Sequence, residues 1–313
     1  MLSWFRKRPA PDGPNVVRLR PPSGFGDHLM LSAVLEGVKA EHPEVRFFLA
    51  ARHPELFHRN PHVEEVLDVH KLRKRDPERV EAYIHATHRP PEARYLQVRG
   101  HLIDDIYDHV PVTMKRRPRQ PRLYLTEREL AYRERELERL PRPRIAIVPH
   151  GKASVHLPNK LYPGDQWAEL GALLVREFPT VLHLGTQKDG PLIPGARDYR
   201  DLGYRNTAGL MTRCDLLVTH VGGLMHLAAA MRLPSVVLYG AAEHPAISGY
   251  SWNRNLYTPI ECGPCWAREP CDHHSCMRRL PPSLVVEQVR AALAELSAGR
   301  PAAADPAGIV EVA

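Results

Sequence analysis

The sequence contains no long apolar run. None of its segments approaches the roughly 18 consecutive apolar residues that a membrane-spanning helix needs. Residues 1–8 combine two aromatic side chains with a basic cluster, but they have no apolar stretch of the kind that a secretory signal carries. The sequence therefore predicts a cytoplasmic protein without a membrane span.

Cysteine is scarce, but its distribution is uneven. The chain has 5 cysteines, and four of them fall within residues 262–276, a loop that also holds two histidines. Four thiolates on one short loop can form a tetrahedral zinc site, which a reducing compartment favours over two disulfides. Packing thiols without a metal are the alternative. The candidate ligands are Cys262, Cys265, Cys271 and Cys276. Cys214, at the start of a predicted strand, is expected to be an inert core thiol.

Nucleic-acid-binding motifs are also missing, although the chain is basic. The formal net charge is +7 and the pI is near 9.2, with the excess gathered at residues 5–8 and 115–122. No aromatic-rich RNA motif or recognition helix accompanies these segments. We therefore expect no nucleic-acid partner. The basic segments either attract an anionic substrate or a membrane surface, or are solvated loops.

The chain is long enough for two domains, and strands alternate with helices along it. Two prolines in Pro141-Arg142-Pro143 interrupt any regular element and mark the boundary. We predict a basic tail over residues 1–15, an N-terminal domain over 16–141, a C-terminal domain over 142–296 and a disordered tail over 297–313.

Each domain is predicted to be Rossmann-like, with a parallel sheet and right-handed crossovers. In the first domain we expect strands at residues 16–20, 45–50, 63–69 and 93–98, short helices at 54–59 and 101–109, and a charged helix at 127–140. In the second we expect strands at 144–149, 180–185, 215–219 and 235–239, and helices at 164–177, 225–231 and 282–296. The two domains would face each other across a cleft at the carboxyl ends of both sheets.

A glycine turn follows the first predicted strand. It contains Gly24, Gly26 and Asp27, and it lacks the third glycine of a dinucleotide-binding fingerprint. Asp27 at the start of a helix either caps its free N–H groups or acts as a general base that deprotonates an acceptor hydroxyl.

A second glycine turn, Val221-Gly222-Gly223-Leu224, joins an apolar strand to a helix of small residues. The free N–H groups at such a helix start suit an anionic diphosphate. His226, within the helix, either positions a phosphate or ribose or is a buried structural histidine.

Lys160 lies in the loop after the first strand of the second domain, where it either neutralises phosphate charge or is a solvated surface residue.

Taken in order, four segments resemble the ADP-heptose:lipopolysaccharide heptosyltransferase family, also called glycosyltransferase family 9. They are Gly26-Asp27, Asn60-Pro61-His62-Val63, Lys160-Leu161-Tyr162-Pro163 and the run of residues 223–230. The cysteine loop resembles that family's C-terminal loop as well. The resemblance covers about residues 16–296 and implies a GT-B fold, in which the N-terminal domain binds the acceptor and the C-terminal domain the donor.

The resemblance also implies a reaction and roles for residues. The reaction is inverting transfer of heptose from ADP-heptose to a hydroxyl of a glycan, glycolipid or natural-product acceptor, as in lipopolysaccharide biosynthesis at the inner membrane. No catalytic metal is needed, because the helix dipole and a lysine stabilise the leaving diphosphate. Asp27 would be the catalytic aspartate and Lys160 the phosphate-contacting lysine, while Gly222, Gly223 and Leu224 would hold the diphosphate. Related autotransporter heptosyltransferases with a cysteine-held iron make iron a second candidate metal.

One departure from the family pattern concerns the donor. Family members carry Asp-Ser-Gly where this chain has Val221-Gly222-Gly223, so a donor-contacting carboxylate is missing. His220 or Glu243 is expected to take its place. Two alternative hypotheses stay open: a transferase with a UDP- or GDP-sugar donor, and a non-catalytic scaffold that binds a nucleotide or a metal.

Overall fold

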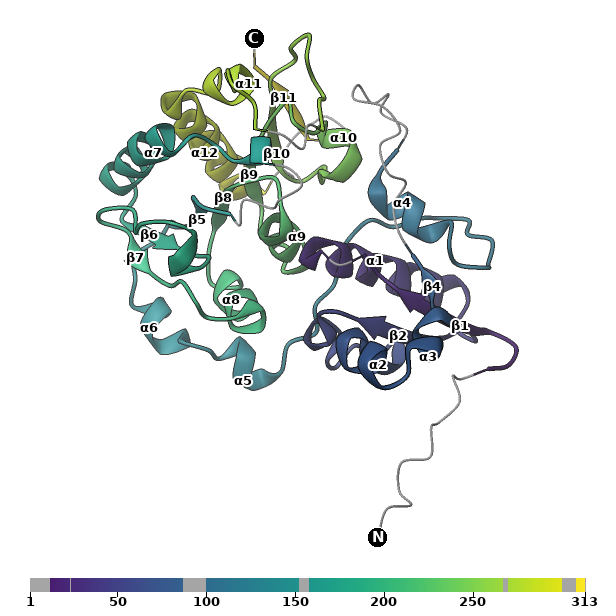
Figure 1. The fold of residues 1–313 in the computed structure, drawn as a ribbon. Helices are drawn as coiled ribbons and strands as arrows, with labels where there is room; N and C mark the ends of the chain where they lie inside the picture. The colour runs from purple at the N-terminus through teal and green to yellow at the C-terminus, as the bar shows by residue number, and fades with distance from the viewer. Residues whose placement is uncertain are drawn as a thin grey trace. The chain divides into compact units, whose positions relative to one another are not determined.

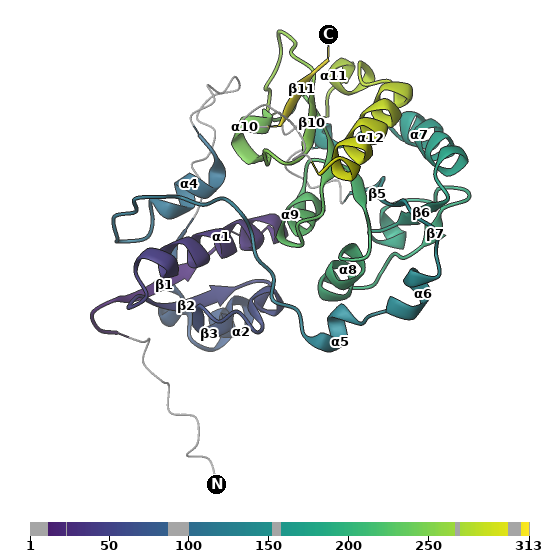
Figure 2. The same ribbon diagram turned by 180° about the vertical axis from the view of Figure 1, so that it is seen from behind.

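The structure is a computed structural model, and it describes residues 12–22, 24–86, 100–151, 158–266, 270–299 and 308–312. Contacts within the chain divide it into two compact units (Figures 1 and 2). The first comprises residues 1–88 and 103–124, and the second comprises residues 89–102 and 125–313. By these contacts, residues 125–141 belong to the second unit although they precede the boundary expected from the prolines.

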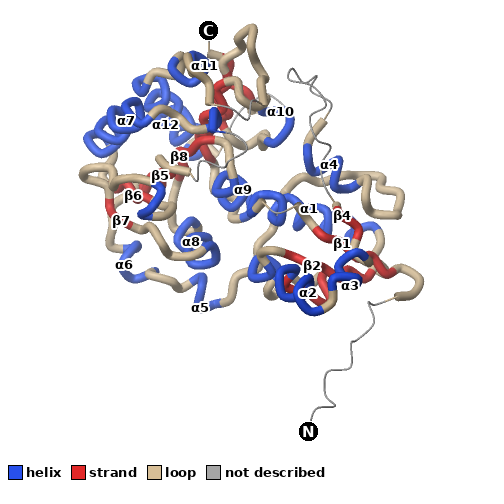
Figure 3. Tube along the Cα trace, in the orientation of Figure 1, coloured by secondary structure: helices blue, strands red, loops and turns tan. Residues whose placement is uncertain are grey.

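The first unit contains a four-stranded parallel sheet in the order β3-β2-β1-β4. Phe48 and Ala50 of β2 pack against Leu72 and Val80 from the two helices that follow β3. Because side chains alternate along a strand, the neighbouring residues of β2 face the other side of the sheet. Figure 3 shows α1 on one side of the strands and α2 with α3 on the other. The elements are β1 (Val16–Arg20), α1 (Phe25–Glu41), β2 (Arg46–Ala51), η1 (Pro54–Phe57), β3 (Val63–Asp68), α2 (Val69–Arg75), α3 (Pro77–Glu81), β4 (Ile84–His85) and α4 (Leu102–Tyr107), whose residues from Ile103 onward belong to this unit.

The second unit contains a seven-stranded parallel sheet in the order β11-β10-β9-β8-β5-β6-β7. Its strands are β5 (Arg144–Val148), β6 (Thr180–His183), β7 (Arg197–Asp198), β8 (Leu216–His220), β9 (Ser235–Gly240), β10 (Arg254–Tyr257) and β11 (Ile309–Glu311). Every residue of β5, β6, β8 and β9 is buried, as expected for parallel strands covered on both faces. The predicted α/β class with two parallel sheets is confirmed.

Helices surround the second sheet, and α7 lies beside α12 in both ribbon views (Figures 1 and 2). The apolar face of α7 explains this position, since Trp167, Leu170 and Leu174 are buried. The helices of this unit are α5 (Glu127–Leu130), α6 (Glu134–Glu138), η2 (Pro158–Lys160), α7 (Gly164–Glu177), η3 (Gln187–Asp189), α8 (Tyr204–Met211), α9 (Gly223–Ala230), α10 (Pro245–Ser248), α11 (Ser275–Arg278) and α12 (Pro282–Ser297). No helix in the described ranges is both long and apolar enough to cross a membrane.

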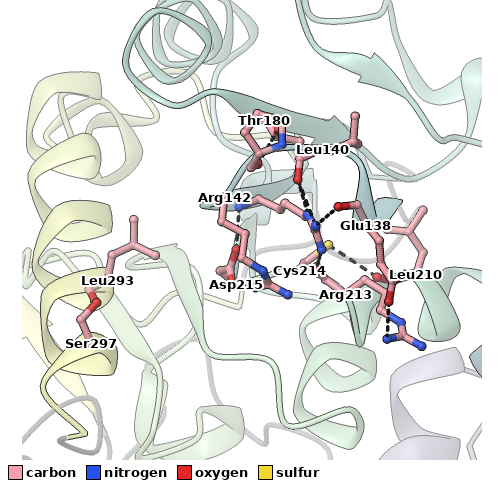
Figure 4. Close-up of polar contacts among 12 residues, drawn as sticks. Glu138, Leu140, Arg142, Thr180, Leu210, Arg213, Cys214, Asp215, Leu293 and Ser297 are labelled. Carbon is pink, nitrogen blue, oxygen red and sulfur yellow. Dashed lines mark hydrogen bonds and ion pairs between the residues drawn. The ribbon is translucent and has the colours of Figure 1, made fainter. Parts of the chain in front are cut away.

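Polar contacts hold the start of β5 and β8 together. Asp215 accepts a hydrogen bond from the backbone N–H of Arg144 at 2.7 Å and forms an ion pair with Arg142 (Figure 4). The buried thiol of Cys214 donates to the carbonyl of Leu210 at 3.6 Å (Figure 4). Burial raises the pKa of Cys214 to about 12, so this thiol has the environment expected of an inert core residue.

Three expectations from the sequence need correction. The charged helix predicted over residues 127–140 is two short helices, because Arg133 adopts a left-handed backbone with φ 53 and places its guanidinium 5.3 Å from the Tyr199 ring centre. The glycine-turn helix begins at Gly223, two residues before the predicted 225. Within the tail expected to be disordered, Ile309–Glu311 forms β11, which adds to the sheet beside β10. The strand predicted at 93–98 lies outside the described residues.

Candidate functional site

The candidate donor-binding residues of the second unit lie where three adjacent strands end. In the sheet, β8 lies between β5 and β9, and all three run parallel. His220 is the last residue of β8, and the turn that follows β9 leads to Glu243. The carboxyl ends of parallel strands form the edge where ligands bind in open α/β sheets.

Lys160 and Glu243 form an ion pair at this edge. The Glu243 residue is only 1% exposed, and its second carboxylate oxygen accepts a hydrogen bond from the Ser248 hydroxyl. Ser248 lies 3.2 Å from the Tyr239 hydroxyl, which extends the polar chain into the core. A buried carboxylate is tolerated only with such partners. Sequence reasoning selected Lys160 and Glu243 separately and missed that they pair.

His220 lies close to the same lysine. Burial lowers its pKa to about 4, with further lowering by the charges of Lys160 and His150. His220 is therefore neutral near pH 7 and does not restore the negative charge that Val221 removes. Its ring is close-packed, since a Cβ at Gly151 would lie 2.5 Å from Nε2. Across the described ranges its Nδ1 atom is buried and has no hydrogen-bond partner.

Gly222, the residue before α9, leaves open space beside its backbone. A Cβ at Gly222 would meet no atom closer than 3.9 Å, in the His220 ring. The backbone of Gly222 is extended, with φ 165, a conformation that other residues also adopt. The fold itself therefore does not require glycine at this position. Gly222 caps α9 without a side-chain hydrogen bond, and the Met225 N–H donates to its carbonyl at 3.1 Å, so within the described residues the N–H groups of Gly223 and Leu224 are the ones available to an anion.

His226 is buried in α9. It is 5% exposed, and its Nδ1 lies 2.7 Å from the hydroxyl of Tyr250, which is also buried. This contact favours the structural interpretation of His226 over direct contact with a donor. Leu224, in the first turn of the same helix, is partly exposed.

Asp27 belongs to the first unit, whereas Lys160, His220 and Glu243 belong to the second. Its carboxylate accepts a hydrogen bond from the Gly24 N–H at 3.1 Å and thus closes the first turn of α1. A Cβ at Gly24 would lie 2.4 Å from this carboxylate, so only glycine leaves room for it. Asp27 is partly exposed, as a general base that meets an acceptor hydroxyl has to be.

The turn that carries Asp27 is held by His28, which sequence reasoning overlooked. His28 is fully buried, and its Nδ1 lies 2.8 Å from the Gly24 carbonyl. Its Nε2 accepts a hydrogen bond from the Arg52 N–H at 3.1 Å, at the end of β2. These two contacts assign the N–H to Nδ1. Burial lowers the pKa of His28 to about 4, so the ring stays neutral.

The five cysteines of the chain are free thiols. Burial and the neighbouring thiols of Cys265 and Cys271 raise the pKa of Cys262. Burial also raises the pKa of Cys276, with contributions from Cys265 and Cys262. The part of the chain that the structure describes has no group of three or more His, Cys, Asp or Glu side chains arranged to hold a metal.

Comparison with known proteins agrees with this geometry. Residues 200–274 match the model of glycosyltransferase family 9 (heptosyltransferase). The match spans β8, the glycine pair, Glu243 and most of the cysteine loop. Over 81 residues the chain is 33% identical to lipooligosaccharide heptosyltransferase 2 of Campylobacter jejuni. The resemblance to the heptosyltransferases of family 9 is confirmed. This alignment covers 25% of the chain and 25% of the relative, so it spans about a quarter of each.

Solved heptosyltransferase structures share the fold of nearly the whole chain. The Escherichia coli ADP-heptose lipopolysaccharide heptosyltransferase II has a TM-score of 0.63 and 20% identity, over 90% of this chain and 99% of that one. The dodecameric iron-containing heptosyltransferase TibC of enterotoxigenic Escherichia coli, in complex with ADP-D-β-D-heptose, has a TM-score of 0.61 and 17% identity, over 90% and 77%. These are GT-B proteins, and the predicted fold class agrees with them.

Proposed function

We propose that this protein is a glycosyltransferase that moves heptose from ADP-heptose to a hydroxyl of a lipopolysaccharide-type acceptor. The single observation that carries the proposal is the ion pair of Lys160 with Glu243, which follows β9 in the segment that matches family 9. In the sheet β9 lies beside β8, the strand that leads into the glycine turn. The fold shared with ADP-heptose-dependent enzymes supports it.

The proposed reaction inverts the anomeric carbon and uses no catalytic metal. The acceptor oxygen forms a bond to the anomeric carbon while the bond from that carbon to the diphosphate oxygen breaks. ADP leaves with the electron pair, and Asp27 takes the proton of the acceptor hydroxyl. Lys160 and the N–H groups of Gly223 and Leu224 at the start of α9 would stabilise the charge that develops on the diphosphate.

The assay for this proposal is ADP release from ADP-heptose in the presence of a heptose-accepting lipopolysaccharide core. Asp27→Asn should abolish release and leave ADP binding nearly intact, whereas Lys160→Met should weaken ADP binding. Retained turnover in Asp27→Asn would remove the role assigned to Asp27. A thermal shift larger with UDP or GDP than with ADP would overturn the choice of donor.

A non-catalytic scaffold remains the second hypothesis, motivated by Val221 in place of the family aspartate. It predicts ADP binding without turnover for any acceptor, including truncated lipopolysaccharides that offer different terminal hydroxyls. Partly exposed Asp27, held in its turn by a buried histidine, is unexplained by a scaffold and favours the enzyme.

We also propose that the cysteine loop binds a structural zinc or iron ion. The support is the four free, neighbouring thiols and the iron content that the name of TibC records. The described thiols are not arranged as a metal site, so the loop has to bring them closer together when the ion binds. Elemental analysis of purified protein should find about one metal per chain. The quadruple variant with serine at residues 262, 265, 271 and 276 should lose it.

A peripheral contact with an anionic membrane is proposed for the segment of residues 115–122. Ion pairs link Arg117 to Asp108, Arg119 to Asp104 and Arg122 to Glu36, which offsets part of the segment's charge. Lys115 and Arg116 would therefore carry the attraction. Sedimentation with anionic vesicles should fall when both are replaced by Glu, and unchanged sedimentation would exclude this segment.

A further inference from the structure

The Trp266 ring lies over the ammonium of Lys160, with 5.0 Å between the ammonium nitrogen and the ring centre. This is the distance of a cation–π interaction. Trp266 belongs to the cysteine loop, and it follows Cys265 directly. Glu243 contacts the same ammonium, so a carboxylate and an aromatic face together hold the lysine.

No hydrogen bond of its own explains the position of the Trp266 side chain. The indole N–H is buried and has no acceptor among the described residues. A buried indole N–H usually finds such an acceptor, because an unpaired N–H costs free energy. The ring instead contacts the charged ammonium group of Lys160.

Backbone contacts of the cysteine loop fix this arrangement from two sides. The N–H of Trp266 donates to the carbonyl of Ala242 at 3.0 Å, next to Glu243. Further along the loop, the N–H of Cys271 donates to the Asn159 side chain at 2.8 Å, next to Lys160. His274 adds a contact of 2.9 Å to the Asn159 carbonyl. The loop therefore contacts residues adjacent to both members of the ion pair.

Within the described residues, part of the lysine side chain stays uncovered. The Lys160 side chain is 19% exposed, whereas that of Glu243 is 2% exposed. An ammonium has three N–H donors, and Glu243 occupies one of them. Glu243 itself has both oxygens engaged, by Lys160 and Ser248, so it is poorly placed to contact a ribose or a sugar.

We propose that Trp266 is a positioning residue, which holds the Lys160 ammonium ready for the diphosphate of a nucleotide donor. The inference rests on the proposed function and adds a task for the cysteine loop. A free lysine side chain loses rotamer freedom when it binds a phosphate, and a lysine held in advance loses less. The gain should appear as affinity for the nucleotide diphosphate.

The test is a double-mutant cycle on ADP affinity, measured by calorimetry on the full chain. Trp266→Leu should weaken ADP binding about tenfold in the presence of Lys160. In the Lys160→Met background the same change should have an effect of less than about twofold, because no ammonium is left to position. Trp266→Phe is the matched control, since it keeps an aromatic face and should retain most of the affinity.

The outcomes separate the inference from the proposed function. A wild-type protein that binds no ADP refutes the proposed function, and the inference falls with it. If wild type binds ADP and Trp266→Leu weakens binding equally with and without Lys160, the ring contacts the donor or supports the fold, and the inference alone is refuted. If leucine prevents folding, as judged by circular dichroism, Trp266→Met fills the space without an aromatic face and carries the same cycle.

Discussion

The buried ion pair of Lys160 with Glu243 predicts a specific pattern of stability losses. Lys160→Met removes the charged partner of a carboxylate that is 1% exposed. Glu243 would keep its hydrogen bond from Ser248 but would carry an uncompensated charge in the core. Glu243→Gln removes that charge and keeps the shape of the side chain.

The magnitude follows from the burial of the two partners. Removal of one member of a buried pair costs about 3–5 kcal/mol, mainly because the other charge is stranded. The 19% exposure of the lysine side chain allows some solvent screening, so we expect about 3 kcal/mol for Lys160→Met. Glu243→Gln should cost about 1 kcal/mol, since the partly exposed lysine can turn towards water. The double variant should resemble Glu243→Gln alone.

Thermal unfolding without nucleotide measures this cycle. For a unit of this size 1 kcal/mol corresponds to about 2–4 °C, so Lys160→Met should lower the Tm by about 6–12 °C. The addition of Glu243→Gln should then recover most of the loss. Lys188 lies on η3, away from this pair in the sequence, and offers a matched control. Lys188→Met should change the Tm by less than about 2 °C. Additive losses in the double variant would refute the stranded-charge argument.

Three further predictions concern protons, backbone and thiols. Burial lowers the pKa of His28, His183 and His220 from 6.5 to about 4, so the unfolded chain binds more protons between these pH values. Stability should therefore be full above pH 6.5 and fall towards pH 4, by up to about 3 kcal/mol for each histidine; a flat profile of Tm over this range would contradict the pKa directions. Gly222→Ala should leave the Tm within about 2 °C but weaken ADP binding about tenfold, since the new methyl group meets ligand and not protein; a large Tm loss would show that the fold needs the glycine. Cys214 should resist thiol reagents in the native protein and react after denaturation, as mass spectrometry of labelled peptides can test, because its pKa is about 12; rapid native labelling would contradict its burial.

Local patterns were sufficient to predict most of the sheet strands. The strands at residues 144–148 and 235–240 are buried on both faces. A parallel strand that is covered on both faces appears in the sequence as a continuous apolar run, so it can be predicted from local pattern. The same holds for the glycine turn before α9, because the strand, the turn and the helix are neighbours along the chain. The short helices near Arg133 could not be predicted this way, since the break depends on a left-handed residue whose guanidinium lies near a distant tyrosine ring.

The sequence alone determined the order of the motifs, and that order was enough to indicate the family. It also placed Lys160, Glu243 and the cysteine loop among the candidate residues. Only the tertiary structure decided that these three belong to one arrangement, in which Glu243 and Trp266 both contact the lysine. The physical reason is that they follow different strands or lie in separate loops, so no local spacing relates them. The parallel sheet brings its carboxyl ends to one edge, and there a buried charge must find its partner.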